Sequence, residues 1–136
     1  MDRIPTVLED AVDYAKSYNS IVIVPHPFDT WRSGIGEKIY DVKVDAIEIF
    51  NPWSTVNANK EALMACKTLK VTGLANSDSH TIESLDLAYN ILRLREFSEE
   101  EVFKCIVKGD LKPVGCLLYT SPSPRDLSTS RMPSSA

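Results

Sequence analysis

The sequence predicts an α/β fold with a parallel sheet, because short apolar strands alternate with helical segments along the chain. The apolar run at 21–24 and the strand-like segment at 45–50 each stop at a proline-containing turn, as buried parallel strands commonly do. A third run at 71–75 follows a helical segment and ends in a polar loop. Strand, helix and strand in this order predict right-handed crossovers between parallel neighbours.

Capping signals place the helices of this pattern. The first helix is expected to begin after Thr6, with Glu9 completing a capping box. The second is expected over 57–69, where apolar residues recur at helical spacing. The last is expected to begin at a second capping box, at Ser98, and to end before Gly109.

The segment between the third strand and the last helix is less regular. Residues 87–94 fit either a short strand or a helix, and the strand is the preferred interpretation. With this strand, the expected order is helix, strand, loop, strand, helix, strand, short strand and helix, which still indicates an α/β fold.

Composition narrows the class of protein. The 136 residues are 43% hydrophobic and 25% charged, and 15 basic against 19 acidic side chains give a net charge of −4. Such an acidic balance does not favour broad binding to nucleic acid or to anionic membranes. No apolar run approaches the ~20 residues of a membrane span, and no leader is evident. Three widely spaced cysteines fit free thiols, so a cytoplasmic location is expected.

Composition changes abruptly at residue 116. Residues 116–136 are rich in serine and proline and lack periodicity, so they are expected to be disordered and to add nothing to the core. Back-translation of Cys116–Asp126 and Ser130–Ala136 resembles a sequencing adapter interrupted by a barcode-sized gap. We therefore interpret 1–115 as the folded domain and 116–136 as a non-native tail, with a natural disordered tail as the alternative.

The residues that carry chemistry gather at the ends of the expected strands. His26 follows the first strand, Asn51 the second, and Asp78 with His80 the third. Carboxyl ends of parallel strands meet at one edge of a sheet, where active sites form. In extended chain Asp78 and His80 would point the same way. Mixed imidazole and carboxylate donors suit zinc, manganese or iron, so the residues together predict a metal site, although a lone histidine or a lone Asp-x-His is more often an ordinary loop feature.

Four segments in order carry a family resemblance. They are Pro25-His26-Pro27-Phe28-Asp29, Arg32 with Gly34-Ile35-Gly36, Asp45-Ala-Ile-Glu-Ile-Phe-Asn51, and Ser77-Asp78-Ser79-His80. Together they resemble the PHP (polymerase and histidinol phosphatase) superfamily, above all its stand-alone phosphoesterases, over nearly all of 1–115. The resemblance implies the C-terminal portion of a distorted (β/α)7 TIM-like barrel with parallel strands. It also implies two or three divalent metal ions (Mn, Zn or Fe) at the mouth of the complete barrel.

The resemblance also implies hydrolysis of phosphate esters by metal-activated hydroxide, with His26, Asp78 and His80 as catalytic residues and metal ligands. Arg32 could bind the substrate phosphate through its planar guanidinium, or pair with a nearby acidic side chain. Asn51 could bind substrate near the metal mouth, or simply cap a strand end. The expected partner is a small phosphorylated substrate, with nucleic acid only as a nucleotide or oligonucleotide substrate.

The sequence departs from the family in one respect. PHP proteins open with an H-x-H pair and further ligands, whereas this chain has only two histidines. We therefore expect the chain to lack the N-terminal half of its domain and to be inactive as a fragment. The alternative to a fragment is a short natural PHP relative. The alternative to an enzyme is a non-catalytic PHP-type module associated with a polymerase or an RNA-processing complex.

Overall fold

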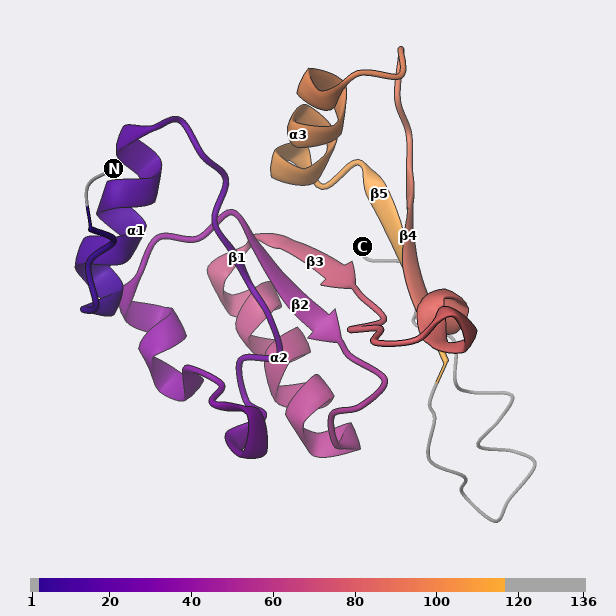
Figure 1. Ribbon diagram of the computed structural model, residues 1–136, viewed down its shortest axis with the longest axis horizontal. Coiled ribbons are helices and arrows are strands. Elements are labelled where there is room, and N and C mark those ends of the chain that lie inside the picture. The colour runs from indigo at the N-terminus through magenta and orange to yellow at the C-terminus, as the bar shows by residue number, and fades with distance from the viewer. Residues whose placement is uncertain (1–2, 117–136) are drawn as a thin grey trace.

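The computed structural model describes residues 3–116, so the tail predicted over 116–136 lies, apart from Cys116, outside the described residues. Figure 1 shows a small parallel sheet at the centre, with helix α2 behind it and helix α1 beside it. A separate two-stranded unit with helix α3 stands next to the sheet. Within the described residues, no helix has the length and apolar character needed to cross a membrane.

The central sheet contains three parallel strands in the order β1-β2-β3. They are β1 (Ile23–Val24), β2 (Ala46–Phe50) and β3 (Thr72–Ala75). All five residues of β2 are buried, which fits a strand covered on both faces. The parallel α/β arrangement predicted from the sequence is therefore confirmed, although the first strand is shorter than the apolar run that predicts it.

Helix α2 (Val56–Leu69) connects β2 to β3 and covers one face of the sheet. Its N-cap is Thr55, whose hydroxyl accepts the Ala58 N–H at 3.1 Å. Because side chains alternate along a strand, Ile47 and Ile49 face α2 and form the main core with it. Ala46, Glu48 and Phe50 therefore point to the opposite face.

The segments before and after β1 frame the edge of the sheet. Helix α1 (Leu8–Ser17) has Val7 at its N-cap, with no side-chain capping bond, so the expectation that Thr6 caps this helix is wrong. The chain enters the helix one residue later, with Val7 in the extended conformation. Two short 3-10 helices, η1 (Thr30–Arg32) and η2 (Gly36–Asp41), follow β1 and lead to β2.

The second unit begins with the 3-10 helix η3 (Ile82–Leu87) and strand β4 (Ala88–Leu92), which confirms the strand preferred for 87–94. Helix α3 (Glu99–Lys108) and strand β5 (Leu111–Gly115) follow. Strand β5 was not expected, and it pairs with β4 in the antiparallel sense, so not all strands are parallel. The physical reason is that the α3 excursion returns the chain to the end of β4, placing Leu111 opposite Leu92.

The caps of α3 are as predicted. The Ser98 hydroxyl accepts the Glu101 N–H at 3.2 Å, and Gly109 takes a left-handed conformation with φ of 74°. The two units meet where Phe50 packs with small residues of β3 and β4. A Cβ on Gly115 would lie 2.1 Å from the Phe50 ring, which shows how closely β5 approaches the central sheet.

Candidate functional site

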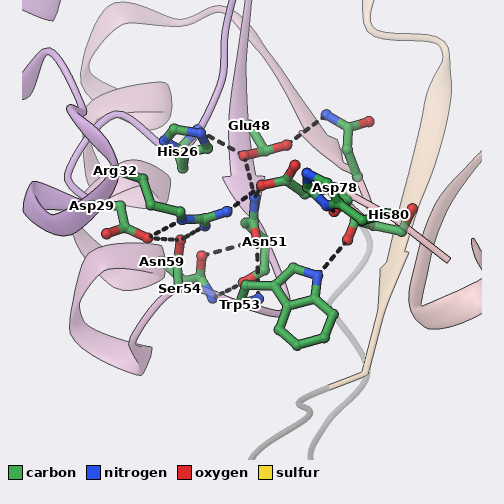
Figure 2. Close-up of polar contacts among 12 residues, drawn as sticks. His26, Asp29, Arg32, Glu48, Asn51, Trp53, Ser54, Asn59, Asp78 and His80 are labelled. Atoms are coloured by element: carbon green, nitrogen blue, oxygen red, sulfur yellow. Dashed lines mark hydrogen bonds and ion pairs between the residues drawn. The ribbon is translucent and has the colours of Figure 1, made fainter. Parts of the chain in front are cut away.

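Polar side chains converge where the three parallel strands end, and we call this group the strand-end cluster (Figure 2). Its members come from the loops after β1, β2 and β3 and from β2 itself. They are His26, Asp29, Arg32, Glu48, Asn51, Ser54, Asn76 and Asp78. The cluster lies at the edge of the sheet where the sequence predicts functional residues.

Glu48 joins the three loops of the strand-end cluster. It is only 3% exposed, and one of its carboxyl oxygens accepts the backbone N–H of His26 at 2.7 Å and the Asn51 amide at 3.0 Å. The other oxygen accepts the Asn76 amide at 3.1 Å. Sequence reasoning missed this residue, although a charged side chain inside a buried apolar strand is the signal that could have identified it.

Arg32 is held on the side of the cluster nearest η1. Its guanidinium donates to Asp29 at 2.9 Å and to the Ser54 hydroxyl at 3.0 Å, and it also pairs with Asp78. The Ser54 hydroxyl in turn donates to Asp29 at 2.9 Å. Burial alone would raise the pKa of Asp29, but the hydrogen bonds from Arg32 and Ser54 outweigh it and lower that pKa. Pairing with a nearby acidic side chain, one of the two roles open for Arg32, is therefore present in this structure.

Asp78 is the carboxylate on which the cluster converges. It accepts the Asn51 amide at 3.1 Å and pairs with Arg32. Burial raises its pKa, yet the Asn51 hydrogen bond, the Arg32 guanidinium and the charge of the nearby His26 together bring the pKa below its usual value. Asp78 thus lies among donors and cations and is strongly favoured as an anion.

His26 has two unusual features. Its φ of 25° lies in a region that residues with side chains rarely adopt, and the hydrogen bond from its N–H to Glu48 helps to hold it there. Its Nδ1 atom is buried and has no hydrogen-bond partner within residues 3–116. An unpaired buried ring nitrogen is costly unless something else binds it, so this atom is a candidate donor to a ligand.

His80 lies apart from the buried part of the cluster. Its side chain is exposed, and Nδ1 lies 2.9 Å from the main-chain oxygen of Asp78 (Figure 2). The expectation that extended backbone aligns Asp78 with His80 does not apply, because Asp78 has a left-handed φ of 49°. The structure therefore brings Asp78, Arg32 and Asn51 into contact and places His26 nearby, while His80 lies at the exposed rim.

Asn51 closes the end of β2, which is one of the two roles that the sequence leaves open. It is fully buried, and its backbone N–H and carbonyl bond to the Asn59 side chain at 3.0 and 3.1 Å, so it ends β2 firmly. Its own amide bridges Glu48 and Asp78. Trp53, two residues on, donates its indole N–H to the carbonyl of Ser77 at 3.0 Å and closes this side of the cluster.

The side-chain amides of Asn90 and Asn76 link the cluster to the two-stranded unit. The Asn90 side chain pairs with the backbone of Ala75, accepting its N–H at 2.9 Å and donating to its carbonyl at 2.8 Å. This pairing fixes which end of the Asn90 amide is the donor. Its NH2 group also lies 3.3 Å from the Asn76 oxygen, so Asn76 presents its own NH2 group to Glu48.

The donor types suit a divalent metal ion, but their number does not. Imidazole and carboxylate groups are present, and the unpartnered Nδ1 of His26 is available. In the part of the chain that the structure describes, however, no three histidine, cysteine, aspartate or glutamate side chains are grouped so that they could hold an ion. The residues that the structure describes therefore do not form a complete metal site by themselves.

Comparison with known proteins supports the resemblance seen in the sequence. Residues 56–111 match the family described as PHP-associated. An uncharacterized protein of Methanocaldococcus jannaschii is 29% identical over 45 residues, which are 33% of this chain and 26% of that protein. The crystal structure of a two-domain protein of Bacteroides vulgatus, containing a predicted PHP-like metal-dependent phosphoesterase, is similar with a TM-score of 0.62.

The extent of these matches limits what they establish. The Bacteroides similarity covers 93% of this chain but 41% of that chain, at 16% identity, so it shows the fold. This chain spans less than half the length of either protein. The resemblance to the C-terminal part of PHP proteins is confirmed, and the α/β fold with it, whereas the described residues form no closed barrel.

Proposed function

We propose that this chain, with its PHP-associated segment, is the C-terminal part of a metal-dependent phosphoesterase and forms one side of its active site. The carrying observation is that His26 and Asp78 lie near each other at the carboxyl ends of parallel strands in a fold similar to a PHP-like protein. In the complete domain these strands would belong to a distorted (β/α)7 barrel. The remaining ligands would come from parts of the domain that this chain does not contain.

The strand-end cluster supports specific roles for its residues. His26 offers a buried, unpartnered nitrogen, and Asp78 offers a carboxylate whose pKa is lowered. His80, on the same loop as Asp78, would complete the set of ligands from this chain. Two or three manganese, zinc or iron ions bound with the remaining ligands would polarise a phosphoryl oxygen and activate water.

Arg32 and Asn51 would act on the substrate and on Asp78. Arg32 has the planar fork that binds phosphate oxygens, and it now donates to two carboxylates and a hydroxyl. A substrate phosphate would compete with those acceptors for the guanidinium. Asn51 keeps Asp78 oriented through its amide, whether or not substrate is bound.

One observation favours a second candidate, a non-catalytic PHP-type module that associates with a polymerase or an RNA-processing complex. Arg32 pairs with the carboxylate assigned to metal binding, and the described residues do not group three ligands. A protein that keeps the fold without catalysis would show the same arrangement. The two candidates differ in whether the complete protein hydrolyses phosphate esters.

The test uses the protein encoded by the complete reading frame of this gene, beside the 136-residue chain. Phosphate release from an aryl phosphate and from nucleotides is measured with added manganese or zinc and with a chelator. We expect chelator-sensitive activity in the complete protein and little in the chain alone. Asp78→Asn and His26→Ala in the complete protein should remove most of the rate, whereas the exposed control Asp86→Asn should retain it.

Two results would contradict the proposal. Activity that survives the chelator, or that persists in Asp78→Asn, would remove the metal mechanism. A complete protein that folds and binds no manganese in a calorimetric titration would favour the non-catalytic module.

A further inference from the structure

A cavity of about 470 Å³ lies between α2, β3 and α3. Val71, Thr72 and Gly73 at the amino end of β3 form part of its wall, whereas the strand-end cluster lies at the carboxyl ends. The cavity and the cluster are therefore at opposite ends of the sheet. Its volume falls within the ~300–1,000 Å³ typical of pockets for small ligands.

The charge of this cavity is opposite to that of the whole chain. Lys67, Lys70 and Lys108 line it, and none of the residues lining it is acidic. No ion pair within residues 3–116 joins any of these lysines to a carboxylate. In a chain with a net charge of −4, three uncompensated ammonium groups around one cavity favour an anionic ligand.

The ends of two helices bring these lysines together. Lys67 lies in the last turn of α2 and Lys108 in the last turn of α3, while Lys70 is the left-handed C-cap of α2. A helix C-terminus favours a nearby cation, which accounts for a lysine at each end. The Cys66 carbonyl near the end of α2 already accepts backbone N–H groups, and so does the Cys105 carbonyl of α3. The ammonium groups are therefore not needed as caps and remain available to a ligand.

The rest of the wall is apolar. Ile49, Leu63, Val71 and Val107 lie beside the three lysines. Phosphate oxygens bind ammonium groups through charge-assisted hydrogen bonds, and an apolar wall suits a ring or carbon chain attached to the phosphate. Inorganic phosphate alone would leave most of this volume unused.

A neighbouring cavity extends the basic surface. It measures about 190 Å³, shares Lys108, and is also lined by Arg93, Arg95 and Lys104. Two acidic residues, Glu101 and Asp110, also line it. Glu101 pairs with Arg95 and Lys104, but no ion pair of Arg93 is found in the described part of the chain. Because Lys108 lines both cavities, a ligand in the larger cavity can extend toward the basic side chains of the smaller one.

We propose that the larger cavity, the lysine pocket, binds an organic polyphosphate of nucleotide size, with its phosphates on Lys67, Lys70 and Lys108. The organic part packs against the apolar wall, and a terminal phosphate extends toward the neighbouring cavity. This binding is separate from the strand-end cluster and does not depend on the hydrolytic function proposed for it.

The experiment titrates the 136-residue chain with ATP in the presence of a chelator, followed by calorimetry. The variant Lys67→Gln/Lys70→Gln/Lys108→Gln should bind ATP at least tenfold more weakly. The matched control Lys38→Gln/Lys43→Gln/Lys60→Gln removes the same charge from exposed lysines elsewhere and should change the affinity less than twofold. Tripolyphosphate should bind more weakly than ATP, and adenosine should not bind detectably.

Further measurements make each outcome decisive. Arg32→Gln should bind ATP as the unmodified chain does, and loss of binding would place ATP at the strand-end cluster and overturn the proposal. An equal loss in both lysine sets, or no ATP binding at millimolar concentration, would also overturn it. If a single-stranded oligonucleotide binds more tightly than ATP, the ligand of the lysine pocket is nucleic acid and the proposal of a small polyphosphate is overturned. If the triple variant unfolds, two measurements take its place. They are the ATP affinity of Lys108→Gln and the changes in the amide NMR shifts of Gly73 and Gly109 when ATP is added.

Discussion

Replacing Glu48 with alanine should destabilise the chain severely, because this carboxylate satisfies three donors in the interior. The His26 N–H, the Asn51 amide and the Asn76 amide all bond to it, and the side chain is only 3% exposed. Truncation leaves a cavity between three loops and removes the acceptor of each donor.

The size of the effect follows from what each donor can do next. A buried donor without a partner costs about 1–3 kcal/mol. The His26 N–H would bear this cost in full, since Glu48 is the acceptor that the structure gives it. The Asn51 amide keeps its bond to Asp78, and Asn76 is partly exposed and can reach water, so each adds a smaller amount. We expect a total loss of about 3–5 kcal/mol from the free energy of unfolding, a large share of the ~5–15 kcal/mol typical of a domain.

Urea unfolding followed by circular dichroism at pH 7 measures this loss. Glu48→Gln should lie between the alanine variant and the unmodified chain. The glutamine keeps one acceptor oxygen, but its NH2 group must face another donor, because the side-chain amides of Asn90 and Asn76 are fixed in their orientations. Glu61→Ala, an exposed position in α2, is the control and should change stability by less than about 0.5 kcal/mol. If Glu48→Ala costs no more than this control, the cluster is not held together as described.

Three further predictions rest on other contacts. The pKa values of Asp29 and Asp78 are lowered in the folded state, so their contribution to stability should be complete above about pH 4 and should be lost as the pH falls through the folded values, as acid titration of unfolding would show. Gly115→Ala places a methyl group 2.1 Å from the Phe50 ring and should cost about 1–3 kcal/mol in urea unfolding; an unchanged midpoint would show that β5 approaches less closely. Ser98→Ala removes the cap of α3 and should cost about 1 kcal/mol, with a melting temperature several degrees lower; no change would mean that the cap is not formed.

The parts of the fold that the sequence predicts are those specified by local signals. Residues 45–50 and 71–75 are short, mostly apolar segments with sharp ends, and both form parallel strands. The Ser98 capping box and Gly109 mark α3 because caps are chemical requirements of a helix end. Strand β5 could not be predicted in this way, since its five residues include a proline and a glycine and it exists through pairing with β4.

The same distinction, between local sequence signals and contacts that form only in the assembled fold, applies to the candidate site. Residues at strand ends can be read from the sequence, so Asn51 and Asp78 are found in contact as the pattern suggests. The backbone at Asp78 is left-handed, so the side chains of Asp78 and His80 point in different directions. This conformation depends on the surrounding loops and has no local sequence signal. The role of Glu48 depends on donors from three different loops and emerges only when the sheet is assembled.

The pairing between Asn90 and Ala75 has a consequence for how the central sheet can grow. At Ala75 the backbone N–H and carbonyl of β3 are already bonded to the Asn90 side-chain amide, as they would be to a neighbouring strand. A new strand would have to displace Asn90 before it could pair with the end of β3. Strand β1, in contrast, pairs with a neighbour on one side only within the described residues. Further strands, from the remainder of a barrel or from another copy that pairs wrongly, would therefore add at the β1 edge. A charged residue or a proline in place of exposed Ile23 would block this pairing with a single substitution.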